Sequence, residues 1–428
     1  MSDPRHTPPS SDAVRIERAL DLLKPNCDAL RAIERLKREL TPELARRAAQ
    51  IFELRRKSSA RFPSGELRAL TAKGLEQATR EPVARARAQR IASIAAATGT
   101  RSCSVYDATC GIGADTLALA GAGLRVIAGD RSLEAARCAR ENSLARAEHV
   151  CVILADAMLP PVRADFLVVD PDRRSGGGRT RDGARWSPSL AQVCELAQRF
   201  KGACIKLPPG FDIAEAEVHL PRDLRRRWQW VSCSRELCET ALWTGELAGT
   251  GDGATTEHEA LALGLASGAE ARIEGRPFVV GSEVPQKVSE IRWLAEPDPS
   301  VIRAGLLGNL ARELGLAPLG PRNAFLVGVR APRSELCRAW RVLGVAPADP
   351  RRVRPLLAEH DIGTLAIIKR GHPDSGEVLA RRFRGRGRRH GLLAIARLER
   401  GHLALLLDTA GASGWVGDEG FEPPTSSV

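Results

Sequence analysis

One stretch about a quarter of the way along the chain constrains its fold more than any other. Residues 104–107 read Ser-Val-Tyr-Asp, a β-branched and aromatic run typical of a short strand. Gly111 and Gly113 follow in a turn, and the apolar residues 116–120 begin a helix. In an α/β sheet, a strand, a glycine turn and a helix in this order present backbone N–H groups to a nucleotide-sized ligand. Glycine is needed because a side chain there would hold the ligand away from the backbone.

Three further strands follow this turn, and each brings an acid to its carboxyl end. The strands cover residues 123–130, 149–157 and 164–170, and the acids are Asp130, Asp156 and Asp170. Because the carboxyl ends of parallel strands meet at one edge of the sheet, the acids and the turn should face one crevice. Asp130 stands about 20 residues beyond Asp107, where a carboxylate accepts hydrogen bonds from both ribose hydroxyls. Asp156 could accept the amino group of an adenine.

The turn departs from the dinucleotide fingerprint at one position. Thr116 stands where the third glycine of G-x-G-x-x-G would be. An NAD-dependent dehydrogenase is therefore disfavoured.

Composition and charge limit the functional classes. With 428 residues, the chain is long enough for two or three domains. Its net charge of +12 favours a nucleic-acid partner, although the abundance of Arg, Ala, Gly and Pro could instead reflect a compositional bias. Aromatic residues make up 4% of the chain, which disfavours a base-stacking platform for single strands.

Neither a membrane segment nor a metal site is predicted. No apolar run is long enough to span a membrane, and the polar residues 1–10 lack the apolar core of a signal peptide. The ten cysteines are scattered without a C-x-x-C pair, so reduced thiols are expected. A cytoplasmic location is the resulting expectation.

Helices are predicted before the glycine turn. They lie within residues 14–59 and 83–97. Thr41, which precedes a proline, is a predicted helix start, and Thr71 and Thr79 are predicted caps. Since this segment leads into the first strand, Gln77 and Thr79 either belong to a plain helical hairpin or border the ligand.

The sheet continues beyond residue 200, and a second block follows it. Further strands are predicted over 203–210, 227–232, 241–245, 259–264 and 271–273, a helix over 301–314, and a block over 334–407 that reads helix, strand (363–370), helix, strand (392–398), strand (403–407). Residues 174–188 form a predicted flexible, basic loop suited to closing over a substrate. The run from Arg381 to His390 has the arginine density of a phosphate-contacting surface, or of a solvated basic face.

Six motifs, taken together, resemble one protein family. They are Gly74-Leu-Glu-Gln-Ala-Thr79, Asp107-Ala-Thr-Cys-Gly-Ile-Gly-Ala-Asp115, Asp170-Pro-Asp-Arg-Arg174, Trp186-Ser-Pro188, Lys206-Leu-Pro-Pro-Gly210 and Leu365-Ala-Ile-Ile-Lys-Arg-Gly371. From about residue 62 to residue 407, the chain resembles the bacterial class I S-adenosylmethionine (SAM) methyltransferases with a C-terminal THUMP-like domain. Because SAM carries no phosphate, the missing third glycine agrees with this family.

The resemblance implies an α/β protein with a Rossmann-like methyltransferase sheet and an α+β module similar to the THUMP domains of RNA-modifying enzymes. The expected parts are a helical N-terminal region (1–100), a SAM-binding methyltransferase domain (101–250), a connecting α/β segment (251–333), a THUMP-like domain (334–410) and a disordered tail (411–428).

The candidate site residues form two groups. Cofactor binding is assigned to Gln77, Asp107, Thr109, Gly111, Gly113, Asp115, Thr116, Asp130 and Asp156, and catalysis or substrate positioning to Asp170, Pro171, Arg173, Arg174 and Lys206. Asp170 ends the strand nearest the expected methyl group and would orient or deprotonate the nucleophile. Arg173, Arg174 and Lys206 would hold substrate phosphates.

One departure from related enzymes leaves the methylated atom open. Enzymes that methylate exocyclic amines usually carry a second proline and an aromatic residue after strand four, and Asp172 and Arg173 stand at those positions here. The expected function is methyl transfer from SAM to a nucleotide in RNA, either rRNA or tRNA. Two alternatives stay open: a non-catalytic RNA-binding or ribosome-assembly factor on the same fold, and a methyltransferase acting on a protein or small molecule.

Overall fold

The computed structural model divides into two compact units, Met1–Ala203 and Cys204–Val428. It describes residues 11–23, 27–99, 103–160, 163–173, 182–249, 257–264, 268–278, 288–320 and 323–409. Two predicted segments lie outside these ranges. They are the tail 411–428 and residues 174–181 of the loop 174–188, which include Arg174. No helix in the described part of the chain is long and apolar enough to cross a membrane.

The first unit begins with three helices that share a core of their own. They are α1 (Ser11–Asp21), α2 (Ala29–Glu39) and α3 (Pro42–Ser58), and their apolar faces meet around Leu36 and Ala48, which are almost fully buried. Thr41 is the N-cap of α3 with a proline directly after it, as predicted. The helical reading of this region is therefore confirmed.

Two more helices lead to the first strand. They are α4 (Ala72–Gln77) and α5 (Glu81–Ala97). The Thr71 hydroxyl caps α4 by accepting a hydrogen bond from the Gly74 N–H at 2.9 Å. The predicted cap at Thr79 is wrong, because Arg80 is the N-cap of α5. The Thr79 hydroxyl donates instead to the carboxylate of Asp115 at 2.6 Å.

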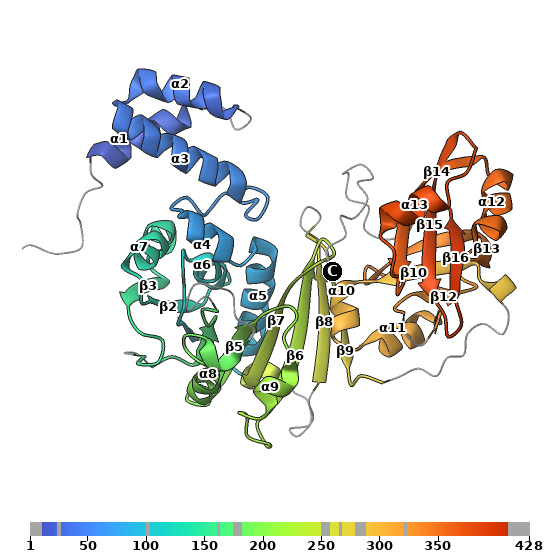
Figure 1. The fold of residues 1–428 in the computed structure, drawn as a ribbon. Coiled ribbons are helices and arrows are strands. Elements are labelled where there is room, and N and C mark those ends of the chain that lie inside the picture. Colours follow the sequence, from blue (N-terminus) through green and yellow to red (C-terminus); the bar gives the residue numbers. More distant parts are fainter. Residues whose placement is uncertain are drawn as a thin grey trace, which may run out of the picture. The chain divides into compact units, whose positions relative to one another are not determined.

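A parallel sheet forms the rest of the first unit (Figure 1). Its elements are β1 (Ser104–Asp107), α6 (Ala114–Gly121), β2 (Arg125–Asp130), α7 (Leu133–Asn142), η1 (Leu144–Arg146), β3 (Val150–Leu154), β4 (Phe166–Val169), η2 (Gly183–Arg185) and α8 (Leu190–Ala197). The strands lie in the order β3-β2-β1-β4 and are mutually parallel. The carboxyl ends of the four strands therefore share one edge, as the sequence predicts.

The second unit contains strands of two sheets. The first group is β5 (Gly202–Leu207), α9 (Ile213–Glu217), β6 (Arg226–Cys233), β7 (Glu236–Gly245), η3 (Glu246–Ala248), β8 (Glu257–Leu263) and β9 (Glu270–Gly275). Here β6 pairs antiparallel with β7 and parallel with β8, and β8 pairs antiparallel with β9.

A seven-stranded sheet follows. Its elements are η4 (Val288–Glu290), β10 (Trp293–Pro297), α10 (Pro299–Arg303), α11 (Leu307–Leu314), β11 (Ala317–Pro318), β12 (Leu326–Gly328), β13 (Cys337–Pro347), α12 (Pro350–Glu359), β14 (Ile362–Arg370), α13 (Gly376–Arg382), β15 (Arg389–Arg397) and β16 (His402–Leu407). The strand order is β11-β12-β10-β13-β16-β15-β14. Alternate residues of β15 and β16 enter two different cores, one on each face of the sheet. Helices α12 and α13 cover one of these faces, because Leu357 and Leu379 join its core.

Several boundaries differ from the prediction. The predicted helix 301–314 is two helices, α10 and α11, with Gly305 at φ +71° between them. Residues 337–347, predicted within a helical start of the last block, form β13, and β10 was not predicted at all. Strand β3 ends at Leu154, two residues before Asp156.

Candidate active site

The two glycines of the central turn have different tasks. Gly111 has φ +54° and Gly113 φ +92°, a left-handed backbone that favours glycine at both positions. A Cβ added to Gly113 would lie 3.2 Å from the Cα of Ala139, so this glycine lets α7 approach the start of α6. A Cβ added to Gly111 would meet no atom within 4 Å. The backbone at Gly111 is therefore open to a ligand.

Thr116 ties the first helix of the sheet to β1. Its hydroxyl donates to the carboxylate of Asp107 at 2.6 Å, and both side chains are buried. The residue that breaks the dinucleotide fingerprint thus fixes the end of β1 to the first turn of α6.

Asp130 holds the glycine turn against the end of β2. One carboxylate oxygen accepts the Gly111 N–H at 3.0 Å, and the other accepts the Ser132 N–H at 2.8 Å. A carboxylate oxygen can accept two hydrogen bonds. Each oxygen of Asp130 therefore keeps capacity for a ligand hydroxyl.

The end of β4 is joined to the same turn. The Asp170 N–H donates to the Thr109 hydroxyl at 2.7 Å, which fixes Asp170 beside the turn, and Pro171 is buried directly after it. Asp172 and Ser187 then exchange two backbone hydrogen bonds of 3.0 and 2.9 Å.

Arg131 links this segment back to β2. Its guanidinium donates to the Ser187 hydroxyl at 2.8 Å. One ring of hydrogen bonds thus connects the turn, the end of β2, the segment around Ser187 and the end of β4. Sequence reasoning missed Arg131 and Ser187, although the Trp-Ser-Pro motif and the residue after a strand-ending acid pointed to them.

Helix α4 lies against the glycine turn. A Cβ on Gly74 would clash with the Ile112 side chain, and Leu75 shares a small core with Ile112. Asn142 of α7 donates to the Ile112 carbonyl at 2.8 Å and accepts the Ala69 N–H at 2.7 Å, so it clamps the segment before α4 onto the turn. No pattern in the sequence assigned a role to Asn142.

The remaining predicted residues are placed as follows. Gln77 is exposed at the last position of α4. Asp115 is buried and is held by Thr79 and Arg87. Asp156 is exposed and accepts the Met158 N–H at 2.9 Å. Arg173 is half-buried, and Lys206 is a buried residue of β5 in the second unit.

The turn carries negative charge. Burial raises the pKa of the Tyr106 phenol to about 12, and the nearby Asp107, Asp156 and Asp130 contribute to the rise. Burial and the charges of Asp107 and Asp130 also raise the pKa of the Cys110 thiol well above its usual range. Both groups therefore stay neutral at pH 7, and the carboxylates leave a field that suits a cationic ligand.

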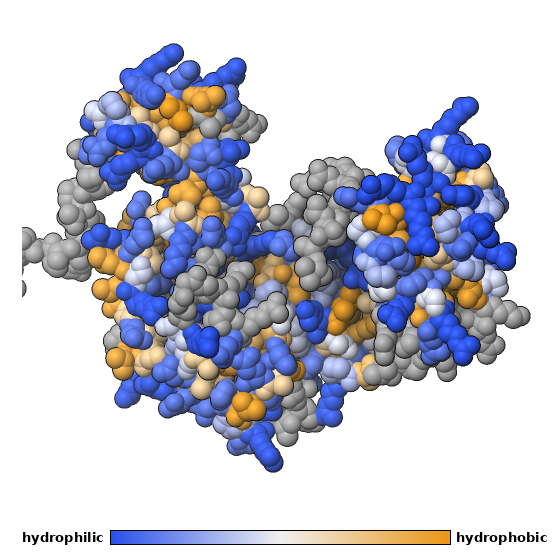
Figure 2. Space-filling model, in the orientation of Figure 1, coloured by the Kyte–Doolittle hydropathy of each residue, from blue (hydrophilic) through white to orange (hydrophobic). Residues whose placement is uncertain are grey.

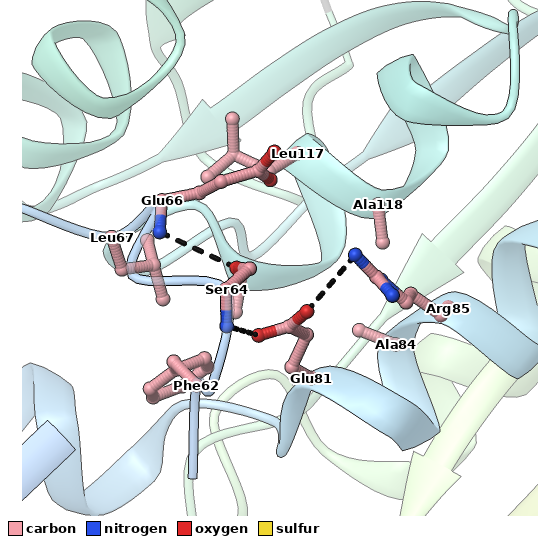
Figure 3. Close-up of a pocket in the computed structure, with 10 residues that line it drawn as sticks. Phe62, Ser64, Glu66, Leu67, Glu81, Ala84, Arg85, Leu117 and Ala118 are labelled. Atoms are coloured by element: carbon pink, nitrogen blue, oxygen red, sulfur yellow. Dashed lines mark hydrogen bonds and ion pairs between the residues drawn. The ribbon is translucent and has the colours of Figure 1, made fainter. Parts of the chain in front are cut away.

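A separate small pocket lies between α5 and α6 (Figure 3). It has a volume of about 30 Å³, the space of roughly one water molecule. Glu81 at its wall accepts the Ser64 N–H at 2.9 Å and pairs with Arg85 at 3.1 Å. Its size excludes it as a nucleotide site.

The chain is similar to methyltransferases over most of its length. An S-adenosylmethionine-dependent methyltransferase of uncharacterised reaction from Mycobacterium tuberculosis H37Rv is 32% identical over 340 residues, 78% of this chain and 86% of that protein. The chain belongs to the S-adenosylmethionine-dependent methyltransferases.

Two further comparisons describe its parts. The family described as THUMP domain-like matches residues 337–409. A structure assigned as a methyltransferase, from Porphyromonas gingivalis W83, shares the fold with a TM-score of 0.67 and 19% identity, over 92% of this chain and 96% of that one. An uncharacterised RNA methyltransferase of Gloeobacter violaceus is 38% identical over 81 residues, which is 18% of each chain.

The residues of the glycine turn fit SAM. The open backbone at Gly111 leaves room for a ligand to approach, and the unused acceptor capacity of Asp130 suits ribose hydroxyls. The negative field of Asp107, Asp130 and Asp156 suits the cationic sulfonium.

Proposed function

We propose that this methyltransferase transfers the methyl group of SAM to a nucleotide in RNA. SAM brings a methyl group that is already activated on a sulfonium, so the chain has mainly to align an attacking lone pair with it. The THUMP-like module and the partial similarity to an RNA methyltransferase support an RNA substrate. The observation that carries this proposal is the arrangement of the arginines in the run from Arg381 to His390.

Glycines fix these arginines in place. The Gly385 N–H donates to the Gly363 carbonyl at 2.9 Å, and the Gly387 N–H donates to the Ile362 carbonyl at 3.2 Å. A Cβ on Gly385 or Gly387 would clash with the backbone of residues 361 and 362. Only glycine therefore lets this segment lie flat along the start of β14.

The arginines that alternate with these two glycines face solvent as a consequence. Arg384, Arg386 and Arg388 are exposed, and none of the three forms an ion pair with a described residue. Figure 2 shows mainly hydrophilic side chains over the part of the second unit that carries α12 and α13. A row of guanidinium groups with fixed backbone positions suits successive phosphates of a nucleic acid.

Cofactor binding is proposed for the residues around the turn. Gly111 provides the close backbone approach, Gly113 supports it by letting α7 pack against the start of α6, Asp130 binds the ribose hydroxyls and Asp156 accepts the adenine amino group. Thr109, Asp107 and Thr116 hold the strand ends and helix in position for this contact.

Asp170 is the proposed catalytic group. The Thr109 hydroxyl fixes its backbone next to the turn, at the end of β4. Asp170 accepts the proton that the substrate atom releases as it gains the methyl group. Arg173 and Arg174 are assigned to substrate phosphates, Lys206 keeps the same assignment by itself, and Pro171 turns the chain away from the sheet.

Cofactor binding and methyl transfer test this proposal separately. Calorimetry should show that the wild type binds SAM. The affinity for SAM should fall at least tenfold in Asp130→Ala, because two hydrogen bonds to the ribose are lost. Transfer of a tritiated methyl group to bulk bacterial RNA should fall at least a hundredfold in Asp170→Ala, with SAM affinity unchanged. Asp223→Ala, which removes an exposed acid before β6, is the matched control and should behave as wild type in both assays.

Each unexpected result has a distinct meaning. A wild type that binds no SAM would favour the non-catalytic RNA-binding factor. A wild type that binds SAM but methylates only protein or small molecules would remove RNA as the substrate. Full turnover in Asp170→Ala would remove Asp170 from catalysis.

A further inference from the structure

Two arginines from different elements bind one carboxylate in the second unit, and a third arginine lies opposite that residue across a strand pair. Arg235, in the turn between β6 and β7, donates to the Glu296 carboxylate at 3.4 Å, and Arg370, at the end of β14, donates to its other oxygen at 2.9 Å. Arg338 is the cross-strand partner of Glu296 in the β10–β13 pair, so its side chain leaves the sheet on the same face. Glu296 is the only acid of the four residues.

A second acid near Arg338 is already engaged. Asp298 is buried and accepts hydrogen bonds from the Ser232 hydroxyl, the Ser300 hydroxyl and the Ser300 N–H. It caps α10 and forms no ion pair in the described ranges. The positive charge around Glu296 is therefore incompletely balanced by ion pairs.

Two of the arginines retain unused donors. Arg338 is exposed and forms no hydrogen bond or ion pair with a described residue, and the Nε of Arg370 is buried without a hydrogen-bond partner there. Although the Arg338 side chain reaches solvent, the protein around it partly desolvates the guanidinium and lowers its pKa, and the charge of Arg235 lowers it further against the opposing effect of Glu296 and Asp298. An anion beside Arg338 would accept hydrogen bonds from its unused donors and relieve its repulsion with Arg235.

The backbone of the β6–β7 turn is specialised around this cluster. Ser234 and Arg235 both have positive φ, 50° and 64°, although neither is glycine. Arg235 is held in this conformation by hydrogen bonds from its guanidinium to the carbonyls of Glu296 and Pro297, both at 3.2 Å. Residues in such conformations concentrate at functional sites.

We propose that Arg338 and Arg370 form a phosphate-binding site for the RNA backbone. This inference rests on the proposed RNA substrate. The site lies at the opposite end of β14 from the row Arg384, Arg386 and Arg388, and eight residue steps of β14 separate the two ends by about 26 Å. One RNA strand contacts both sites by following β14, which is an edge strand of its sheet.

Glu296 makes the proposal testable with variants of opposite effect. Binding of fluorescein-labelled oligouridylate is measured by anisotropy from low to high salt. Arg338→Ala should reduce the slope of log K against log salt by about 0.7, the value of one phosphate contact on a single strand. Glu296→Gln should tighten binding at least threefold, because it removes the carboxylate that competes with phosphate for Arg370. Arg222→Ala, an exposed arginine at the opposite end of β6 from the turn, should leave both quantities unchanged.

The outcomes separate this site from the proposed function. A wild type without salt-dependent binding overturns both. The wild type can bind RNA in a salt-dependent way while Arg338→Ala leaves the slope unchanged and Glu296→Gln does not tighten binding. That result overturns the phosphate site alone. Thermal melting of each variant identifies a Glu296→Gln protein that has lost its fold, and the slope of the exposed Arg338→Ala variant then decides.

Discussion

Single side chains at the edges of the parallel sheet decide how its strands begin and end. Thr116 shows this best, since its hydroxyl joins the end of β1 to α6 through Asp107. Asp165 does the same at the start of β4, where it accepts the N–H and the hydroxyl of Ser104 and an ion pair from Lys201 at 2.7 Å. Both acids link a strand to a neighbour through a short side chain that loses little conformational entropy.

Asp165 should make stability depend on pH in the acid range. Burial by itself would raise its pKa, but the hydrogen bonds and charge of Lys201 and the hydrogen bonds of Ser104 lower the pKa from 3.8 to about 2. The folded state therefore binds the proton less readily than the unfolded state, and the carboxylate stabilises the fold above pH 4. This contribution is lost as the pH falls from about 4 to about 2.

Thermal melting at a series of pH values checks this expectation. The wild type should melt above Asp165→Asn at pH 6, and the two melting temperatures should converge toward pH 2. A constant gap between them would show that the ionised carboxylate contributes nothing.

At the scale of elements, a buried ion pair holds the helices before the sheet to the first helix within it. Arg87 of α5 and Asp115 of α6 form this pair, with side chains 2% and 9% exposed, and Thr79 donates to the same carboxylate. Removing Asp115 would leave the Arg87 guanidinium without its carboxylate partner in a site closed to water.

Asp115→Ala should lower the free energy of unfolding by about 3–5 kcal/mol, the range for breaking one side of a buried pair. Thr79→Val removes one hydrogen bond to a charged group and should cost about 1.5–3 kcal/mol. Urea unfolding followed by circular dichroism measures both. Equal stability of Asp115→Ala and the wild type would refute the structural role of this pair.

Helices and strands that are marked by residues within or next to them were predicted correctly from the sequence. The four strands of the first unit, α5 and the helix start at Thr41 are confirmed because periodicity, glycines and prolines mark them directly. The wrong cap at Thr79 has a different cause: a threonine before a helix usually caps it, but the buried Asp115 competes for the hydroxyl.

Pairing with distant strands explains the larger errors. Residues 337–347 form β13 because it pairs with both β10 and β16, neighbours that no local pattern reveals. The same limit applied to the site. The acids at the strand ends were visible in the sequence, whereas Arg131, Ser187 and the clamp at Asn142 depend on contacts between distant segments.

For the whole molecule, the question is whether its net charge of +12 acts diffusely or through one surface. A compositional excess of arginine would attract RNA over the entire protein. A row fixed by glycines at Gly385 and Gly387 would instead make specific phosphate contacts, each releasing counterions on binding. The two cases predict that different arginines contribute to RNA affinity, although the total number of arginines is the same in both.

Two triple variants with the same net charge separate these cases. Replacing Arg384, Arg386 and Arg388 by Gln should reduce the slope of log K against log salt by about 2, since three single-strand contacts are lost. Replacing the exposed Arg137, Arg140 and Arg199 of the first unit by Gln should change it little. An equal reduction of the slope in the two variants would mean that RNA binding depends only on the total charge. A loss confined to the first variant would identify the glycine-fixed row as the surface on which this methyltransferase holds its substrate.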